Sequence, residues 1–194
     1  MKRFIYSFLS VCLFFSSCSL DESPQASVDK DAIFGSEKGL ATYSYSFYNI
    51  LPSVANGFRQ DAMCDYGAVT SFDSFLRDGA YSAENSSGWS WGELRNINYF
   101  IENCVNENVD TAVRNNYIGL ARFFRAYFYY MKVVRFGDVP WIEKTFEVDS
   151  EELYAGRDPR TVVMDHVLED LNFACENITR TKDETGSLVT KWVA

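Results

Sequence analysis

The sequence predicts an all-α protein built from helix pairs that are joined by loops. In four segments, apolar residues recur at spacings of three and four, which is the pattern of amphipathic helices. No segment shows a strand-like alternation of useful length. With 47% hydrophobic and 16% aromatic residues among 194, the chain has enough apolar material for one buried core.

The first two predicted helices are separated by a long irregular segment. The first spans residues 36–51 and ends before Pro52; its apolar stripe consists of Leu40, Tyr43, Phe47 and Ile50. The second spans residues 89–104, with a stripe of Trp91, Leu94, Ile97 and Ile101. Residues 53–88 are broken by glycines and show no sustained period, so we expect a long loop, and such loops usually carry function.

The third predicted helix spans residues 112–136 and is rich in aromatic side chains. Gly137 is a typical helix stop, and Pro140 prevents continuation. Its predicted buried stripe consists of Tyr117, Leu120, Phe124, Tyr127, Met131 and Val134. The basic side chains fall on its other faces, at Arg114, Arg122, Arg125 and Lys132.

Small residues interrupt the rings of this helix. Gly119, Ala121 and Ala126 allow neighbouring helices to approach closely, as they do in tetratricopeptide-like repeats. We therefore expect most of the rings to face a neighbouring helix. The hydroxyls of Tyr129 and Tyr130 are expected to reach water or a hydrogen-bond partner.

The fourth predicted helix lies within residues 157–178. Asp158 is its expected N-cap and Pro159 its first helical residue, and the side chains expected to be buried are Val163, Val167, Leu171 and Cys175. The last residues, GSLVTKWVA, resemble the start of another helix, with Trp192 and Val193 as its first apolar positions. We therefore expect residues 36–194 to be a helical domain that is incomplete at its C-terminal end.

The N-terminus has the features of an export signal. Lys2 and Arg3 precede an apolar run over residues 4–15 that is too short to span a bilayer. Ser16, Ser17 and Cys18 then resemble the lipobox of bacterial lipoproteins, although Phe15 stands where leucine is usual. This resemblance implies a signal peptide over 1–17, a lipid anchor on Cys18 and an acylated tether over 18–35. The alternative is an ordinary signal peptide that is cleaved near a chance cysteine.

Charge and cysteine content exclude several classes of partner. The formal net charge is −9, and loss of Lys2 and Arg3 with the signal would make it more negative. Nucleic acid is therefore not an expected partner, because phosphate neutralisation needs a basic face. Cys64, Cys104 and Cys175 have neither CxxC spacing nor an even number, so we expect buried thiols, with no metal site and no other cofactor.

Several sequence blocks together resemble the N-terminal part of SusD/RagB-type proteins. They are Cys18 with LDESP shortly behind it, YNIL at the end of the first helix, ARFFRAYFYYMKVVRFGDVPW, RDPRTVVMDHVLEDLNFACENI and GSLVTK. The resemblance implies a tetratricopeptide-like fold with long ligand-binding loops. It also implies a lipoprotein at the surface of the outer membrane of Bacteroidetes. Such a protein binds a glycan or other nutrient and delivers it to a SusC-type TonB-dependent transporter.

Catalysis is not indicated by the residues present. The single histidine, His166, lies beside Asp165 on a predicted helix with apolar neighbours, and no GxSxG or HExxH motif accompanies it. A glycosidase needs a pair of carboxylates at a set separation. The loop acids that could supply it are Asp61, Asp65, Asp73, Asp78 and Glu84. Acidic loops are usually only solvated, so we do not expect an enzyme.

Residues 71–91 are the expected ligand-binding stretch. Sugar rings stack their C–H faces on aromatic side chains, and their hydroxyls pair with charged or amide groups. We expect Trp89 to be an exposed stacking ring and Trp91 to belong to the core; the other expected ligand contacts are Tyr81, Arg77, Asp73 and Asn85. The alternative function is a helical-repeat adapter lipoprotein without glycan binding. An exposed aromatic platform in 71–91 would favour the first function, and a smooth concave groove would favour the second.

Overall fold

The computed structural model describes residues 30–52 and 87–194, and within these ranges the protein is helical. Its elements in chain order are α2 (Lys30–Phe34), α3 (Glu37–Ser44), the 3-10 helix η1 (Tyr45–Ile50), α5 (Gly92–Asn103), α6 (Thr111–Phe136), the 3-10 helix η3 (Glu151–Tyr154) and α7 (Arg160–Asn177). An isolated antiparallel bridge joins Val139 to Asp158, and no strand forms in the described part of the chain. The predicted all-α class is confirmed.

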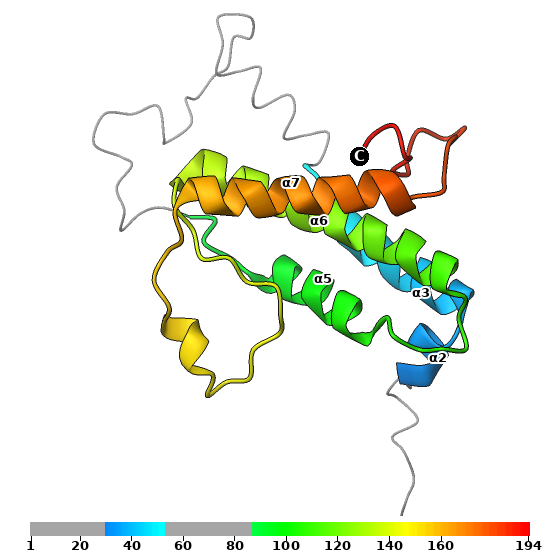
Figure 1. The fold of residues 1–194 in the computed structure, drawn as a ribbon, viewed down its shortest axis with the longest axis horizontal. Helices are drawn as coiled ribbons and strands as arrows, with labels where there is room; N and C mark the ends of the chain where they lie inside the picture. The colour runs from blue at the N-terminus through cyan, green and yellow to red at the C-terminus, as the bar shows by residue number, and fades with distance from the viewer. Residues whose placement is uncertain (1–29, 53–86) are drawn as a thin grey trace, which may run out of the picture.

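Helix α6 is the element around which the others pack. It contacts α3, η1, α5 and α7, and both α5 and α7 run antiparallel to it (Figure 1). Its contact with α7 is close at Gly119, where an added Cβ would meet the side chains of Asn177 and Ile178 at 3.4 Å. Ala121 and Ala126 are also buried. The small residues of α6 therefore permit close helix packing, as the sequence predicted.

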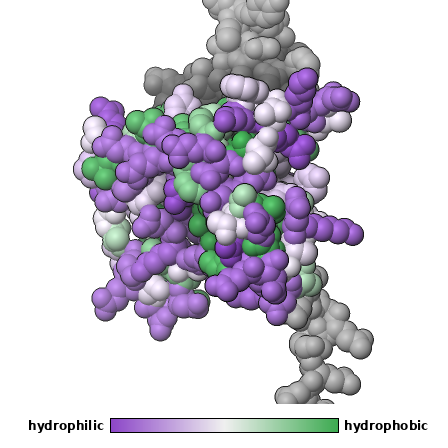
Figure 2. Space-filling view, turned by 45° about the vertical axis from the view of Figure 1, so that its right-hand side comes forward, coloured by the Kyte–Doolittle hydropathy of each residue, from purple (hydrophilic) through white to green (hydrophobic). Residues whose placement is uncertain are grey.

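The buried side chains form two clusters. We call the first the aromatic cluster; it joins α2, α3, η1, α5, α6 and α7, and its largest members are Phe34, Leu40, Phe47, Ile97, Phe100 and Phe124. We call the second the loop-side cluster, because it lies under the segment between α6 and α7; its members are Leu94, Ala126, Phe128, Tyr129, Val139, Val163 and Val167. The outer surface in Figure 2 is mostly hydrophilic, with apolar side chains visible in separate places.

The first predicted helix divides into two parts. Helix α3 begins after Ser36, whose hydroxyl accepts a hydrogen bond from the N–H of Gly39 at 3.1 Å. After Ser44 the chain tightens into η1, which ends at Ile50; Leu51 is extended and precedes Pro52. In addition, α2 lies inside the stretch that we assigned to the tether, and its Phe34 is buried in the aromatic cluster.

Helix α6 departs from the predicted buried stripe in its C-terminal part, whereas Phe124 of that stripe is buried. Met131 and Val134 are 46% and 65% exposed, whereas Arg125 and Lys132 are buried. The prediction of the stripe was wrong at its C-terminal end because apolar side chains occur on nearly every face of this helix. Periodicity then cannot select one face, and the two cations find their partners in segments distant in sequence.

Helix α7 begins at Arg160, one residue after the predicted first helical residue Pro159, and it has a different cap. The carboxylate of Asp158 accepts from the N–H of Trp141 at 2.7 Å, so Asp158 is not the N-cap. The first N–H of the helix, on Arg160, donates instead to Asp138 at 2.9 Å. Val163 and Val167 are buried as predicted.

Further along α7, the expected core residues Leu171 and Cys175 are only half-buried. Asp170 and Ala174 occupy the buried positions of this turn instead. At the end of the preceding helix, Gly137 has φ 71° and confirms the predicted stop of α6.

The last residues form a turn. The N–H groups of Val193 and Ala194 both approach the carbonyl of Thr190, at 3.0 and 3.4 Å, and Trp192 is 77% exposed. Residues 188–194 therefore do not form the helix that the sequence predicted.

Candidate functional site

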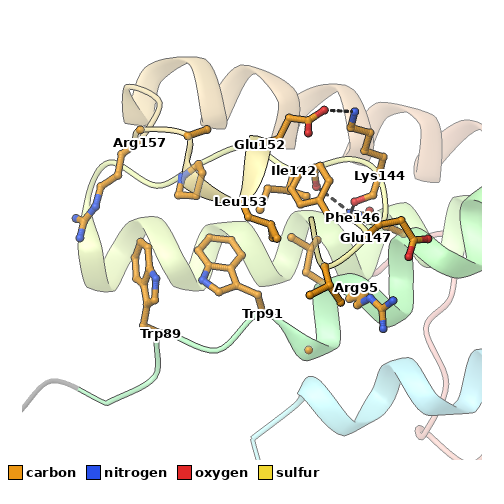
Figure 3. A pocket seen from close by; sticks show the side chains of 17 residues that line it. Trp89, Trp91, Arg95, Ile142, Lys144, Phe146, Glu147, Glu152, Leu153 and Arg157 are labelled. Carbon is orange, nitrogen blue, oxygen red and sulfur yellow. Dashed lines mark hydrogen bonds and ion pairs between the residues drawn. The ribbon is translucent and has the colours of Figure 1, made fainter. Parts of the chain in front are cut away.

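A cavity of about 760 Å³ lies between the start of α5 and the segment that connects α6 to α7 (Figure 3). Its apolar lining comes from Trp89, Trp91, Leu94, Pro140, Ile142, Phe146, Val148 and Leu153. Its polar lining comes from Arg95, Asn98, Lys144, Glu147, Glu152 and Arg157. A mostly apolar hollow with a few polar groups is the usual form of a small-ligand site.

Two tryptophans stand side by side along this cavity (Figure 3). Trp89 is 42% exposed, and its ring meets Trp91 and Phe136 edge-to-face with centroids 5.1 and 4.9 Å apart. Trp91 is half-buried and leans on Phe128 and Tyr129. The exposure of Trp89 is as predicted. Trp91 belongs both to the core, as expected, and to the cavity wall, which the sequence did not indicate.

The rim of the cavity is charged. Lys144 and Glu152 form an ion pair of 2.7 Å with both side chains about half exposed, and the hydrogen bond from Lys144 lowers the pKa of Glu152. At the other end, the guanidinium of Arg157 lies 4.7 Å from the ring centroid of Trp89. Arg157 is itself exposed, so it covers part of the indole without sealing it. Arg95 and Glu147 complete the charged rim (Figure 3).

Tyr129 holds the cavity wall at residues 140–142. Its hydroxyl accepts from the N–H of Ile142 at 2.6 Å and faces the carbonyls of Pro140 and Ile142 at 3.3 and 3.2 Å, to which it can donate. Burial raises the pKa of Tyr129 well above its ordinary value, so the hydroxyl keeps the proton that it donates. This bonded tyrosine was predicted.

A series of buried, hydrogen-bonded polar side chains supports the same wall on its core side. Asn98 donates to the carbonyl of Ile142 at 2.9 Å and accepts from Arg125 at 3.3 Å. Arg125 in turn binds Asp170 through two nitrogens, at 2.6 and 2.8 Å. Asn98, Arg125 and Asp170 are buried, so their hydrogen-bonding groups find partners in one another instead of in water. These bonds connect the cavity wall to α5, α6 and α7.

Most of the predicted ligand contacts cannot be compared with this cavity. Asp73, Arg77, Tyr81 and Asn85 lie outside the described residues, as do Cys18 and the loop carboxylates considered for catalysis. His166 stacks on Trp141 at 4.6 Å and lies 3.3 Å from Glu169, away from the cavity lining. No group of side chains in the described ranges has the arrangement of a metal site.

The segment 140–157, which supplies much of the cavity, was not singled out from the sequence. A signal was present: a long stretch between two helices that contains both apolar and charged residues but no period. Asn98 could not have been found in this way, because a single amide within a helix stripe carries no local sign of its partners.

The family model described as "starch-binding associating with outer membrane" matches residues 40–191. The chain belongs to this SusD-like family. The matched range contains every helix from α5 to α7 and the whole lining of the cavity, so the SusD-like region and the candidate site coincide. The family predicted from the sequence is confirmed.

A solved structure of a SusD-like protein from Bacteroides fragilis has the same fold. It superposes with a TM-score of 0.66 at 19% identity, covering 89% of this chain and 36% of the other. The present chain thus spans about a third of the length of that SusD-like protein. No curated protein matches this sequence. Among the described helices, none is both long and apolar enough to cross a membrane.

Proposed function

We propose that the protein binds an oligosaccharide in the cavity beside Trp89 and Trp91. The observation that carries the proposal is Trp89, a ring left 42% exposed at the cavity while two neighbouring rings meet it at nearly right angles. An aromatic ring that is fixed but not buried offers a flat surface for the C–H face of a sugar. A fixed ring also loses little conformational freedom when a ligand binds.

The charged rim supplies groups for sugar hydroxyls. Lys144 and Glu152 already face each other at 2.7 Å, so one donor and one acceptor stand at the cavity edge. Arg95 and Arg157 offer further planar donors around the same opening. Apolar stacking in the centre with charged groups at the edge is the combination that an oligosaccharide requires.

In the cell, we propose that the protein is a lipoprotein anchored through Cys18 at the surface of the outer membrane. There it would hand its ligand to a SusC-type TonB-dependent transporter, as the resemblance implies. The family description, which names both starch binding and the outer membrane, supports this setting. We propose no catalytic step and no cofactor.

Calorimetric titration of the purified full chain with maltoheptaose, alongside a glycan array, tests the proposal. Replacing Trp89 by alanine should weaken binding by about 1 to 3 kcal/mol, or roughly fivefold to a hundredfold, because the stacking surface is lost. The matched control is Trp192→Ala, since Trp192 is 77% exposed but does not line the cavity. This control should bind as the parent does.

Three results would contradict the proposal. Equal affinities of the parent and Trp89→Ala would place the ligand elsewhere. A lack of binding to every glycan of the array would favour the helical-repeat adapter. Release of shorter sugars from the bound glycan would show an enzyme.

A further inference from the structure

Lys132 is a buried cation in the last third of α6. Its side chain donates to the backbone carbonyl of Gly88 and, at 2.7 Å, to that of Ser90. The residue is 8% exposed, and no carboxylate within the described ranges lies at ion-pair distance from it. Burying an ammonium is unfavourable unless hydrogen bonds compensate, and here the compensation comes from the two carbonyls on either side of Trp89.

The same ammonium is surrounded by the rings that hold Trp89. It lies 5.3 Å from the centroid of Trp91 and 5.8 Å from that of Phe136, the two rings that meet Trp89 edge-to-face. Phe128 lies closer still, at 4.8 Å. Cation–π attraction adds to the hydrogen bonds, so one group attracts both the backbone residues that flank Trp89 and the rings next to it.

The backbone around Trp89 has no regular structure of its own. Residues 87–90 are exposed and outside any helix, and Gly88 has φ 93°. The adjacent cation on α6, Arg135, packs on Gly88 and reaches the hydroxyl of Ser87 at 3.5 Å. Side chains of α6 therefore replace the hydrogen-bond ladder that would otherwise orient this segment.

We propose that Lys132 is a positioning residue for the sugar platform: by binding the carbonyls of Gly88 and Ser90 it sets the angle and exposure of the Trp89 ring. The inference rests on the proposed function, since it concerns the same cavity. It assigns the site a residue that does not line it and that the sequence placed on a face of the helix other than the predicted buried stripe. Burial lowers the pKa of Lys132, in keeping with an ammonium held away from water.

The decisive variant is Lys132→Met, which keeps an unbranched apolar stem beside the rings and removes all three donors. We expect its affinity for maltoheptaose to fall at least tenfold. The double variant with Trp89→Ala should bind no more weakly than Trp89→Ala alone, because Lys132 acts through that ring. Lys132→Arg should recover part of the loss. Lys38→Met, at an exposed site on α3, is the matched control and should leave affinity unchanged.

A second measurement follows Trp89 without any ligand. The indole N–H resonance of Trp89, assigned through Trp89→Phe, should shift in Lys132→Met and not in Lys38→Met. If Lys132→Met does not fold, Lys132→Gln replaces it, since it also removes the ammonium and its side chain ends one bond short of the position of the lysine nitrogen.

These readouts separate failure of the inference from failure of the proposed function. An unshifted Trp89 resonance, or losses that add in the double variant, would overturn the role of Lys132. A shifted resonance together with unchanged binding in Trp89→Ala would support the role of Lys132 and reject the cavity as the glycan site.

Discussion

The aromatic cluster and the loop-side cluster are both buried, yet they are held together differently. In the aromatic cluster, rings meet rings: Phe100 packs against Phe47 and Tyr43, each with centroids 5.2 Å apart. In the loop-side cluster, apolar residues surround polar groups, such as the Tyr129 hydroxyl with its three backbone contacts and the ion pair of Arg125 with Asp170.

The difference follows from the kind of backbone that each cluster packs against. Regular helices satisfy their own backbone groups, so the aromatic cluster needs only apolar surfaces that fit. The loop-side cluster lies against residues 87–91 and 137–147, where irregular backbone leaves N–H and C=O groups without partners of their own. Buried polar side chains supply those partners. The cavity lies beside the loop-side cluster because the irregular backbone there leaves an opening that closely packed helices would fill.

The largest expected effect is on stability in the aromatic cluster. Phe100→Ala should lower the free energy of unfolding by about 3 to 5 kcal/mol, because a fully buried ring is replaced by a cavity. Urea denaturation measures the loss, and glycan affinity at a temperature where the variant is folded should be unchanged. Tyr45→Ala, at a ring that is 58% exposed, is the control and should change stability little. A loss of affinity in Phe100→Ala would mean that the two clusters are coupled.

A smaller effect on stability, but a clear one on binding, is expected from Tyr129→Phe. The change leaves the N–H of Ile142 without its acceptor, at a cost of about 1 to 3 kcal/mol. The wall at 140–142 should loosen, and the affinity for maltoheptaose should fall severalfold in calorimetry. The neighbouring Tyr130 is 51% exposed, so Tyr130→Phe is a matched control for both measurements. Unchanged binding in Tyr129→Phe would show that the wall holds without this hydroxyl.

The smallest expected effect is the pH dependence of stability that comes from Cys104, the thiol of the aromatic cluster. Burial raises the pKa of Cys104 from 9.0 to about 11. Because the folded pKa lies above the unfolded one, the contribution of this thiol to stability is complete below pH 9 and is lost as pH rises towards 11.

We therefore expect the free energy of unfolding to fall more steeply with pH in the parent than in Cys104→Ala over this pH range, as measured by urea denaturation. Alkylation at pH 8, mapped by mass spectrometry, should modify the half-buried Cys175 before Cys104. Faster modification of Cys104 would indicate that the aromatic cluster opens readily.

The sequence by itself located the four long helical segments and marked Trp89 as an exposed ring, although α5 begins at Gly92 and not at residue 89 as predicted. Period, helix stops and small residues act over a few neighbouring positions, so Gly137, Gly119 and Val163 could be interpreted without any knowledge of the fold. The family could be recognised for a related reason, since its blocks are continuous stretches of chain.

Only the tertiary structure decided which face of α6 is buried and which side chains build the cavity. Lys132 meets carbonyls more than forty positions away in sequence, and Asp138 rather than Asp158 caps α7 from across a loop. A polar side chain is buried only where a partner arrives to compensate its lost hydration. The position of that partner depends on how distant segments pack, and the neighbouring residues in the sequence do not predict it.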